Sequence, residues 1–240
     1  MAYEDVLYLH DCYLKEWDAV VKAVDKGKYI VLDKTAFYPN AGGQPYDTGV
    51  MVKDGTAYKV VYVGKFGDNI SHEVDKEGLK VGDKVHCTLD WDRRYKLMRM
   101  HTAAHILSRV IYDDVGANTS GNQLELDKSR IDFTLDEFDR DKISEWFEKS
   151  NEIIKGNRPV KTTLMPRQEA FEIPDLIRTA KNLIPESVKT IRIVDIKDLD
   201  TQACGGTHLK STGEIKGLEF IKAENKGKNN RRIYFKLVDK

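Results

Sequence analysis

Residues 91–111 read WDRRYKLMRMHTAAHILSRVI, and we expect the rest of the chain to be arranged around this stretch. Apolar side chains recur at helical spacing and predict one helix that begins near Trp91; they are Leu97, Met100, Ala104, Leu107 and Ile111. His101 and His105 lie four residues apart, so a helix places both imidazoles on one face. They lie on the flank of the apolar stripe, and we therefore expect them to be half buried.

A second pair of metal-binding side chains lies in the loop Cys204-Gly205-Gly206-Thr207-His208. Glycine lets a backbone fold tightly, so both side chains of the loop can reach one point. Together the two pairs offer one sulfur and three imidazoles, a donor set that suits zinc. We therefore predict one zinc ion per chain, and its ligands are His101, His105, Cys204 and His208.

Two alternatives for this zinc stay open. Four protein ligands are typical of a structural zinc, whereas hydrolytic zinc keeps one coordination position for water or substrate. A metalloprotease is excluded, because Thr102 occupies the place of the catalytic glutamate in HExxH. A zinc finger is excluded too, because roughly a hundred residues separate the two ligand pairs.

The pattern of residues 1–90 predicts a small N-terminal β-barrel, closed or partly closed. Three segments are rich in β-branched and aromatic residues; they are 19–24, 29–32 and 58–63. Turn signals at 25–27, 53–55, 67–69 and 81–83 separate the strands. The one place in this region where we expect a helical turn is near Trp17.

Residues 91–240 predict a second, larger domain of the α+β class, because strands and helices mix without regular βαβ alternation. Asp90 or Asp92 can cap the first helix. Residues 116–122 read as a turn. The further elements expected are strands at 123–126, 130–135, 160–165 and 190–194, a helix at 136–155, short helices over 166–181 that are interrupted at Pro174, and a hairpin from 215–221 and 232–237.

Composition places limits on the compartment and on the partners of the protein. Lys+Arg and Asp+Glu number 39 each, so there is no general positive charge that indicates nucleic acid. The three cysteines form no convincing disulfide framework. The N-terminus lacks the pattern of a secretory signal, and no run approaches the roughly 18 apolar residues of a membrane helix. We expect a cytoplasmic protein.

Two local basic patches lie close in sequence to the proposed zinc ligands. We predict that they contact the phosphates of an RNA. Their candidate residues are Arg93, Arg94, Lys96, Lys226, Lys228, Arg231 and Arg232.

Three motifs resemble those of the alanyl-tRNA editing domain, which occurs inside alanyl-tRNA synthetases and in free-standing AlaX proteins. They are HTAAHIL at 101–107, CGGTHLKSTGEIKGLEFI at 204–221, and the glycine-rich loop FYPNAGGQP at 37–45. The resemblance extends from about residue 5 to residue 238 and is greatest to the medium-length free-standing type. It implies a β-barrel followed by an α+β zinc-containing editing domain.

The resemblance also implies an activity, which is hydrolysis of the ester between a wrong amino acid and the 3′ end of tRNA(Ala). We expect no adenylate-forming synthetase core, and hence a trans-editing deacylase. Its expected substrates are seryl-tRNA(Ala) and glycyl-tRNA(Ala), and alanyl-tRNA(Ala) is spared. Zinc either holds the α-amino group or polarises water. No carboxylate near the ligand motifs stands out as a general base.

Preference for serine requires polar groups that bind its hydroxyl, because alanine would leave them unpaired. Gln44 and Thr119 are the candidate side chains, and Gly42 and Gly43 would supply space and backbone donors. Two other functions remain open. One is a non-catalytic RNA-binding module with structural zinc, and the other is a metal-dependent hydrolase of another small ester.

Overall fold

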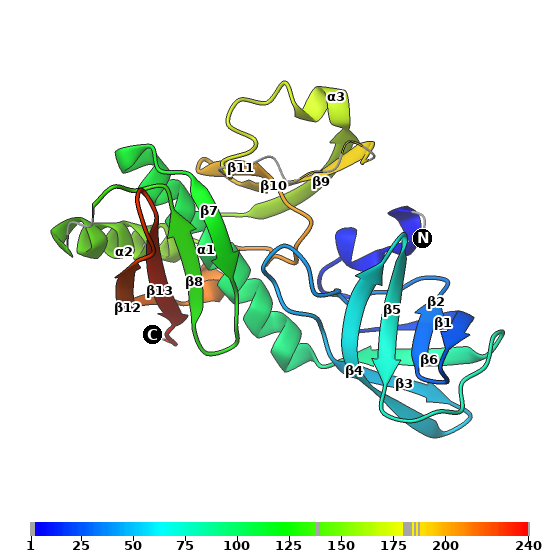
Figure 1. The fold of residues 1–240 in the computed structure, drawn as a ribbon. Helices are drawn as coiled ribbons and strands as arrows, with labels where there is room; N and C mark the ends of the chain where they lie inside the picture. The colour runs from blue at the N-terminus through cyan, green and yellow to red at the C-terminus, as the bar shows by residue number, and fades with distance from the viewer. Residues whose placement is uncertain (1–2, 138–139, 180–183, 185, 187, 240) are drawn as a thin grey trace. The chain divides into compact units, whose positions relative to one another are not determined.

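The computed structural model describes residues 3–137, 140–179, 184, 186 and 188–239. The chain forms two compact units, residues 1–97 and 98–240. Helix α1 (Trp91–Val115) continues from the first unit into the second (Figure 1). The division expected after residue 90 falls at the start of α1, whereas the compact units divide after residue 97, because the first two turns of this helix pack with the barrel.

The first unit is a closed antiparallel barrel with strand order β1-β2-β5-β4-β3-β6, so the predicted barrel is confirmed. Its strands are β1 (Glu16–Asp25), β2 (Tyr29–Leu32), β3 (Gly49–Lys53), β4 (Thr56–Phe66), β5 (Asn69–Val74) and β6 (Lys84–Leu89). The short 3-10 helices Tyr3–Asp5 and Leu7–Leu9 precede them. The expected helical turn near Trp17 is wrong. Trp17, Ala19 and Val21 alternate inward along β1, which is the period of a strand.

The second unit mixes helices with two antiparallel sheets, as the α+β prediction requires. One sheet has the order β12 (Leu218–Asn225), β13 (Arg231–Leu237), β8 (Ser129–Phe133), β7 (Thr119–Gln123). The other has the order β11 (Asp200–Ala203), β10 (Thr190–Ile196), β9 (Val160–Pro166). The remaining helices are α2 (Arg140–Lys155), α3 (Arg167–Ala170) and the 3-10 helix η3 (Thr212–Ile215).

Several expected boundaries differ from those of the structure. Thr119 begins β7, where a turn was expected, because residues 119–123 pair with β8 despite their polar sequence. β12 begins at Leu218 rather than at residue 215, because Ser211 caps η3 through a capping box with Glu214. Asp136 precedes α2. Of the helical segment expected at 166–181, only Arg167–Ala170 is helical among the described residues, because Pro166 ends β9, and residues 180–181 lie outside the described part of the chain.

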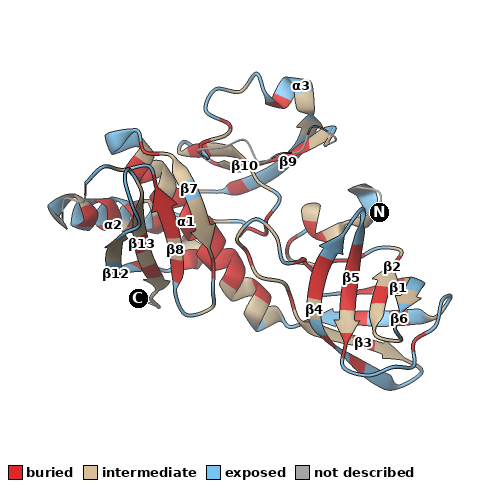
Figure 2. Ribbon diagram, viewed as in Figure 1, coloured by how far each residue is buried: buried red, intermediate tan, exposed pale blue. Residues whose placement is uncertain are grey.

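The middle of helix α1 is enclosed, unlike a surface helix with one apolar stripe. Residues 97–107 are buried without interruption (Figure 2). Asp90 caps the helix, because its Oδ1 accepts a hydrogen bond of 3.2 Å from the Arg93 amide. Among the described residues, no helix combines the length and the hydropathy needed to cross a membrane.

Candidate metal centre

The two ligand pairs predicted from the sequence meet inside the second unit. α1 carries His101 and His105, and the loop after β11 carries Cys204 and His208. The His208 ring lies 4.3 Å from the His101 ring and 4.6 Å from the His105 ring, measured between centroids. One ligand atom from each of the four residues can be chosen so that all lie within 4.8 Å of one another. The four side chains therefore form one group that can bind a metal.

The distances within this group fit zinc. Cys204 Sγ lies 3.3 Å from His208 Nε2 and 3.5 Å from His101 Nε2. Ligands of a tetrahedral zinc, at about 2.0–2.1 Å for nitrogen and 2.3 Å for sulfur, are about 3.3–3.6 Å from each other. The two distances from Cys204 thus match a tetrahedral zinc, and the four ligand atoms, which lie within 4.8 Å of one another, would move closer together around the ion.

Burial also prepares the histidines to bind a metal. His101 and His105 are 6% and 8% exposed, so they are buried rather than half buried as expected. The reason is that every residue of α1 from 97 to 107 is buried, on all sides of the helix. Burial, with a contribution from the Arg192 charge, lowers the pKa of His101 to about 3. Burial likewise lowers the pKa of His105 and of His208 well below the ordinary value. At neutral pH all three imidazoles are uncharged and have a lone pair for a metal.

Arg192 of β10 fixes the conformation of the cysteine loop. Its Nη1 donates to the carbonyl oxygens of Cys204 at 3.0 Å and Gly206 at 2.8 Å. The Cys204 amide donates back to the Arg192 carbonyl at 3.0 Å. This buried arginine, which no sequence motif singled out, holds the loop in the conformation that directs the thiol to the histidines.

Thr102 supports a second ligand. It is fully buried, and its Oγ1 lies 3.2 Å from His208 Nδ1 and accepts from the Leu209 amide at 3.1 Å. With Nε2 of His208 directed to the thiol, an Nδ1–H tautomer of His208 would donate to Thr102. The residue that excludes a metalloprotease thus lies where it can orient a candidate ligand.

A carboxylate that the sequence motifs did not single out lies beside the candidate ligands. Asp200, the first residue of β11, is 4% exposed and forms an ion pair with Arg178. Its Oδ2 lies 3.9 Å from His105 Nδ1. Burial raises the pKa of Asp200, although the Arg178 charge acts in the opposite direction. A signal was present, because Asp200 precedes Cys204 by only four residues.

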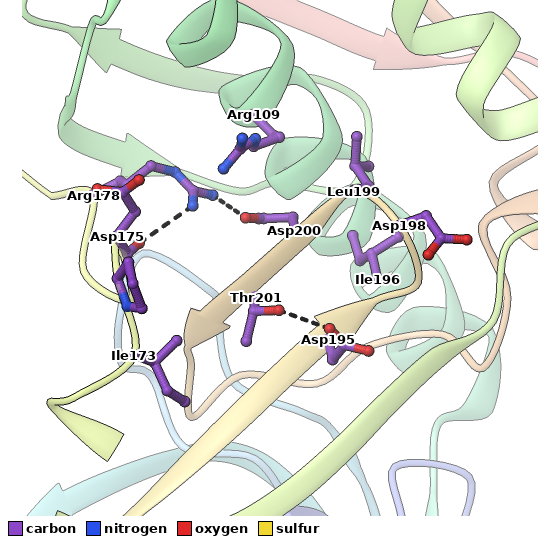
Figure 3. A pocket seen from close by; sticks show the side chains of 11 residues that line it. Arg109, Ile173, Asp175, Arg178, Asp195, Ile196, Asp198, Leu199, Asp200 and Thr201 are labelled. Atoms are coloured by element: carbon purple, nitrogen blue, oxygen red, sulfur yellow. Dashed lines mark hydrogen bonds and ion pairs between the residues drawn. The ribbon is translucent and has the colours of Figure 1, made fainter. Parts of the chain in front are cut away.

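Asp200 and Arg178 also line a pocket of about 320 Å³. Figure 3 shows the Arg178 guanidinium directed to the Asp200 carboxylate, with Arg109 nearby. On the other side of the pocket, Thr201 donates to Asp195 at 2.7 Å. The pocket is thus bordered by paired charged and polar groups.

The glycine-rich loop lies in the barrel unit and is a tight turn. The Ala41 and Gln44 backbones exchange hydrogen bonds of 3.2 and 2.9 Å, and Gly42 and Gly43 have φ angles of +58° and +80°. Glycine adopts this left-handed conformation without the penalty that other residues incur. The Gln44 side chain is fully buried.

The basic residue Arg94 is a correction to the predicted RNA contacts. It is fully buried and forms an ion pair with Asp47, which is also fully buried. Its guanidinium also donates to the carbonyl oxygens of Cys12 and Ala36. A side chain enclosed in this way cannot reach a phosphate on the surface. The sequence could not separate it from Arg93, because adjacent helical residues differ only in the direction in which they point.

The other candidate residues differ in how firmly they are held. Arg93 donates to the Tyr46 carbonyl at 2.9 Å, and Arg232 binds both oxygens of Asp132, at 2.7 and 2.9 Å. Arg231 donates to Asn225 and to the Gly227 carbonyl, and Lys226 forms an ion pair with Glu224. Thr119, the candidate for serine binding, donates weakly to Ser108. Lys96 is partly exposed and Lys228 is exposed.

Comparison with known proteins identifies the class to which this site belongs. Residues 6–93 match the family model of tRNA synthetases class II (A). Residues 191–234, which include two of the four ligands, match the threonyl and alanyl tRNA synthetase second additional domain. Both units therefore carry sequences that are typical of synthetase-related proteins.

Relatives of known name define the family more closely. The chain is 52% identical to the alanyl-tRNA editing protein AlaX-M of Methanosarcina mazei, over 98% of this chain and 97% of that protein. It is 41% identical to AlaX-M of Saccharolobus solfataricus, over 95% and 97%. The alanine–tRNA ligase of Pyrococcus furiosus is 40% identical over 95% of this chain but only 25% of the ligase. The chain belongs to the AlaX-M family of alanyl-tRNA editing proteins.

Proposed function

We propose that this protein is an aminoacyl-tRNA deacylase that hydrolyses seryl-tRNA(Ala) and glycyl-tRNA(Ala) in trans and spares alanyl-tRNA(Ala). Membership of the AlaX-M family makes it a hydrolase of the alanyl-tRNA editing type. The observation that carries the proposal is the convergence of His101, His105, Cys204 and His208 on one point. Near-complete coverage of AlaX-M, against a quarter of the ligase, supports action in trans.

The four converging residues would hold one zinc ion, which supplies a Lewis acid for the substrate amine, its carbonyl or a water molecule. Cys204 is half buried, whereas the three histidines are buried. The aminoacyl end therefore approaches past Cys204 in our proposal, and the histidines form the closed side of the site. An aminoacyl ester is already activated, so holding it in place is a large part of the task.

Selectivity in the proposal comes from the barrel loop and from β7. Gly42 and Gly43 would offer backbone donors, and Thr119 or Gln44 would bind the serine hydroxyl; Gln44, which is fully buried, would do so only if substrate binding uncovers its side chain. Alanine would leave such a group without a partner, at a cost of about 1–3 kcal/mol. Phosphate contacts come from Arg93, Lys96, Lys226 and Lys228, with smaller contributions from Arg231 and Arg232, whose guanidinium groups already bind within the chain.

The test is deacylation of seryl-, glycyl- and alanyl-tRNA(Ala) by the purified protein, before and after removal of metal with a chelator. We expect fast release of serine, release of glycine, and slow release of alanine, with activity lost on chelation and regained with zinc. Cys204→Ala should lose both zinc and activity. Equal rates on seryl- and alanyl-tRNA would refute the editing function, because such an enzyme destroys the product that translation needs.

One observation favours a second function, an RNA-binding module with structural zinc. Four protein donors can complete a tetrahedral shell and leave no position for substrate. The same assay separates the two functions. A structural zinc predicts tRNA binding without release of serine, and loss of folding rather than loss of catalysis when the metal is removed.

A further inference from the structure

Three polar atoms beside the metal centre are buried and have no hydrogen bond within the described part of the chain. They are His105 Nδ1, Asp200 Oδ2 and Arg178 Nε. Leaving a buried polar group unpaired is costly, so native structures seldom keep three of them together. Two of the three face each other, because His105 Nδ1 and Asp200 Oδ2 are 3.9 Å apart.

The most direct resolution of this separation is a small movement of the two side chains. At 3.9 Å the two atoms are about 1 Å beyond the 2.7–3.2 Å of a hydrogen bond. A relative movement of about 1 Å would convert the pair into a direct hydrogen bond. Binding of a metal by the opposite nitrogen of His105 would fix the imidazole and permit this adjustment.

Asp200 is itself firmly held from its other side. Its Oδ1 accepts from Arg178 Nη2, and both residues are at most 5% exposed. The Arg178 guanidinium lies over the Tyr112 ring at 5.4 Å, and its Nη1 donates to the Asp175 carbonyl at 3.3 Å. A carboxylate fixed in this way has one oxygen for the arginine and one directed to the histidine.

We propose that Asp200, held by Arg178, is a positioning residue for the metal ligand His105. Its Oδ2 accepts a hydrogen bond from the Nδ1–H of His105, which leaves Nε2 as the nitrogen that binds metal. A carboxylate behind a ligating histidine orients the ring and increases its basicity. Asp200 would thus do for His105 what Thr102 does for His208. The inference rests on the proposed metal site but not on the identity of the substrate.

Zinc affinity, measured by competition with a chromophoric chelator, tests the role of Asp200. Asp200→Asn and Asp200→Ala should weaken zinc binding by about 10–100-fold. Asp195→Asn is the matched control, because Asp195 lines the same pocket but bonds to Thr201 rather than to a histidine. It should leave zinc affinity unchanged. Thermal midpoints of each protein with and without zinc separate a loss of affinity from a loss of folding.

A measurement on the unmodified protein does not depend on the folding of any variant. Long-range ¹H–¹⁵N spectra of the zinc-loaded protein should show a protonated Nδ1 and a metal-bound Nε2 for His105. A zinc-bound Nδ1, or unchanged zinc affinity in both Asp200 variants, overturns this inference alone. An unmodified protein that binds no zinc overturns the proposed metal site together with it.

Discussion

Single residues in this chain acquire their roles from the hydrogen bonds around them. The two histidines of HTAAH share a helical face, but the proposed ligand set also depends on Thr102 and Asp200. These two residues face Nδ1 of His208 and Nδ1 of His105, the nitrogens that would stay unbound in the proposed zinc site. His72 illustrates the same principle in the barrel. Its Nδ1 donates to the Ile30 carbonyl at 2.8 Å, and its Nε2 accepts from Thr35 at 2.9 Å.

Because His72 is buried and must accept a hydrogen bond, the barrel should lose stability in acid. Burial lowers the pKa of His72 from 6.5 to about 4. Between pH 6.5 and about pH 4, His72 is protonated in the unfolded chain but neutral in the folded chain. The free energy of unfolding should therefore be greatest above pH 6.5 and fall towards pH 4, by up to about 3 kcal/mol. Hydrogen exchange of the barrel strands, followed against pH, measures this.

His72→Gln should flatten this pH dependence, although the variant is less stable at every pH. His86→Gln is the control, because His86 lies exposed beside Asp18 and does not share the buried environment. Equal slopes for the parent and the His72 variant between pH 6.5 and 4 would assign the acid sensitivity to other groups.

Gln44 gives a prediction about selectivity. If Gln44 binds the serine hydroxyl, Gln44→Ala should raise the barrier to serine release by about 1–3 kcal/mol. The ratio of the rates on seryl- and alanyl-tRNA should fall, and the zinc content should be unchanged. Glycine release should be little affected, because glycine has no hydroxyl to bind. Since Gln44 is fully buried, the thermal midpoint of the variant must be measured as well. A uniform decrease for all three substrates would indicate a loop defect instead.

At the scale of elements, a buried ion pair fastens the glycine-rich loop to the start of α1. Asp47 forms an ion pair with the Arg94 guanidinium, and its Oδ2 also accepts a hydrogen bond of 2.6 Å from the Tyr38 amide. The Asp47 amide donates back to the Tyr38 carbonyl at 2.9 Å. The two ends of the segment that carries Gly42 and Gly43 are thereby held together beside one arginine of the helix.

We expect Asp47→Asn to destabilise the barrel by about 3–5 kcal/mol, because it leaves the Arg94 charge buried and uncompensated. Denaturant unfolding of the parent and the variant measures the difference. Asp83→Asn removes a partly exposed carboxylate from its pair with Lys53 and should change stability little. Similar effects for the two substitutions would mean that the buried pair contributes no more than a surface one.

For the whole molecule, a formal net charge of zero means that RNA must be held by local patches. The affinity for tRNA(Ala) should fall steeply with salt. Replacing Lys226 and Lys228 together by alanine should reduce the log–log slope by about 0.7–0.9 for each phosphate that is no longer bound. Replacing the exposed barrel residues Lys76 and Lys80 should leave the slope unchanged. Salt-insensitive binding, or equal slopes for both double variants, would count against these contacts.

This choice of lysines follows from the structure and not from the sequence. Lys228 is exposed and Lys226 has only a surface pair with Glu224 at 3.5 Å, whereas Arg231 and Arg232 are engaged by Asn225 and Asp132, so that removal of the arginines would also disturb the hairpin. A count of basic residues treats all of these side chains alike. The interactions of each side chain within the fold decide which basic residues can contact a phosphate without a loss of protein stability.

The sequence alone determined the features that local chemistry fixes. Strand periodicity and turn residues predicted the barrel, helical spacing predicted α1, and the four candidate ligands followed from two short motifs that need no neighbours to be recognised. The tertiary structure decided the features that depend on long-range contacts. It buried Arg94 against Asp47, enclosed His101 and His105, and placed Asp200 behind a candidate ligand nearly a hundred residues away in sequence. The physical reason is that spacing fixes the direction of a side chain relative to its own element, whereas burial and hydrogen-bond partners depend on what packs against that element.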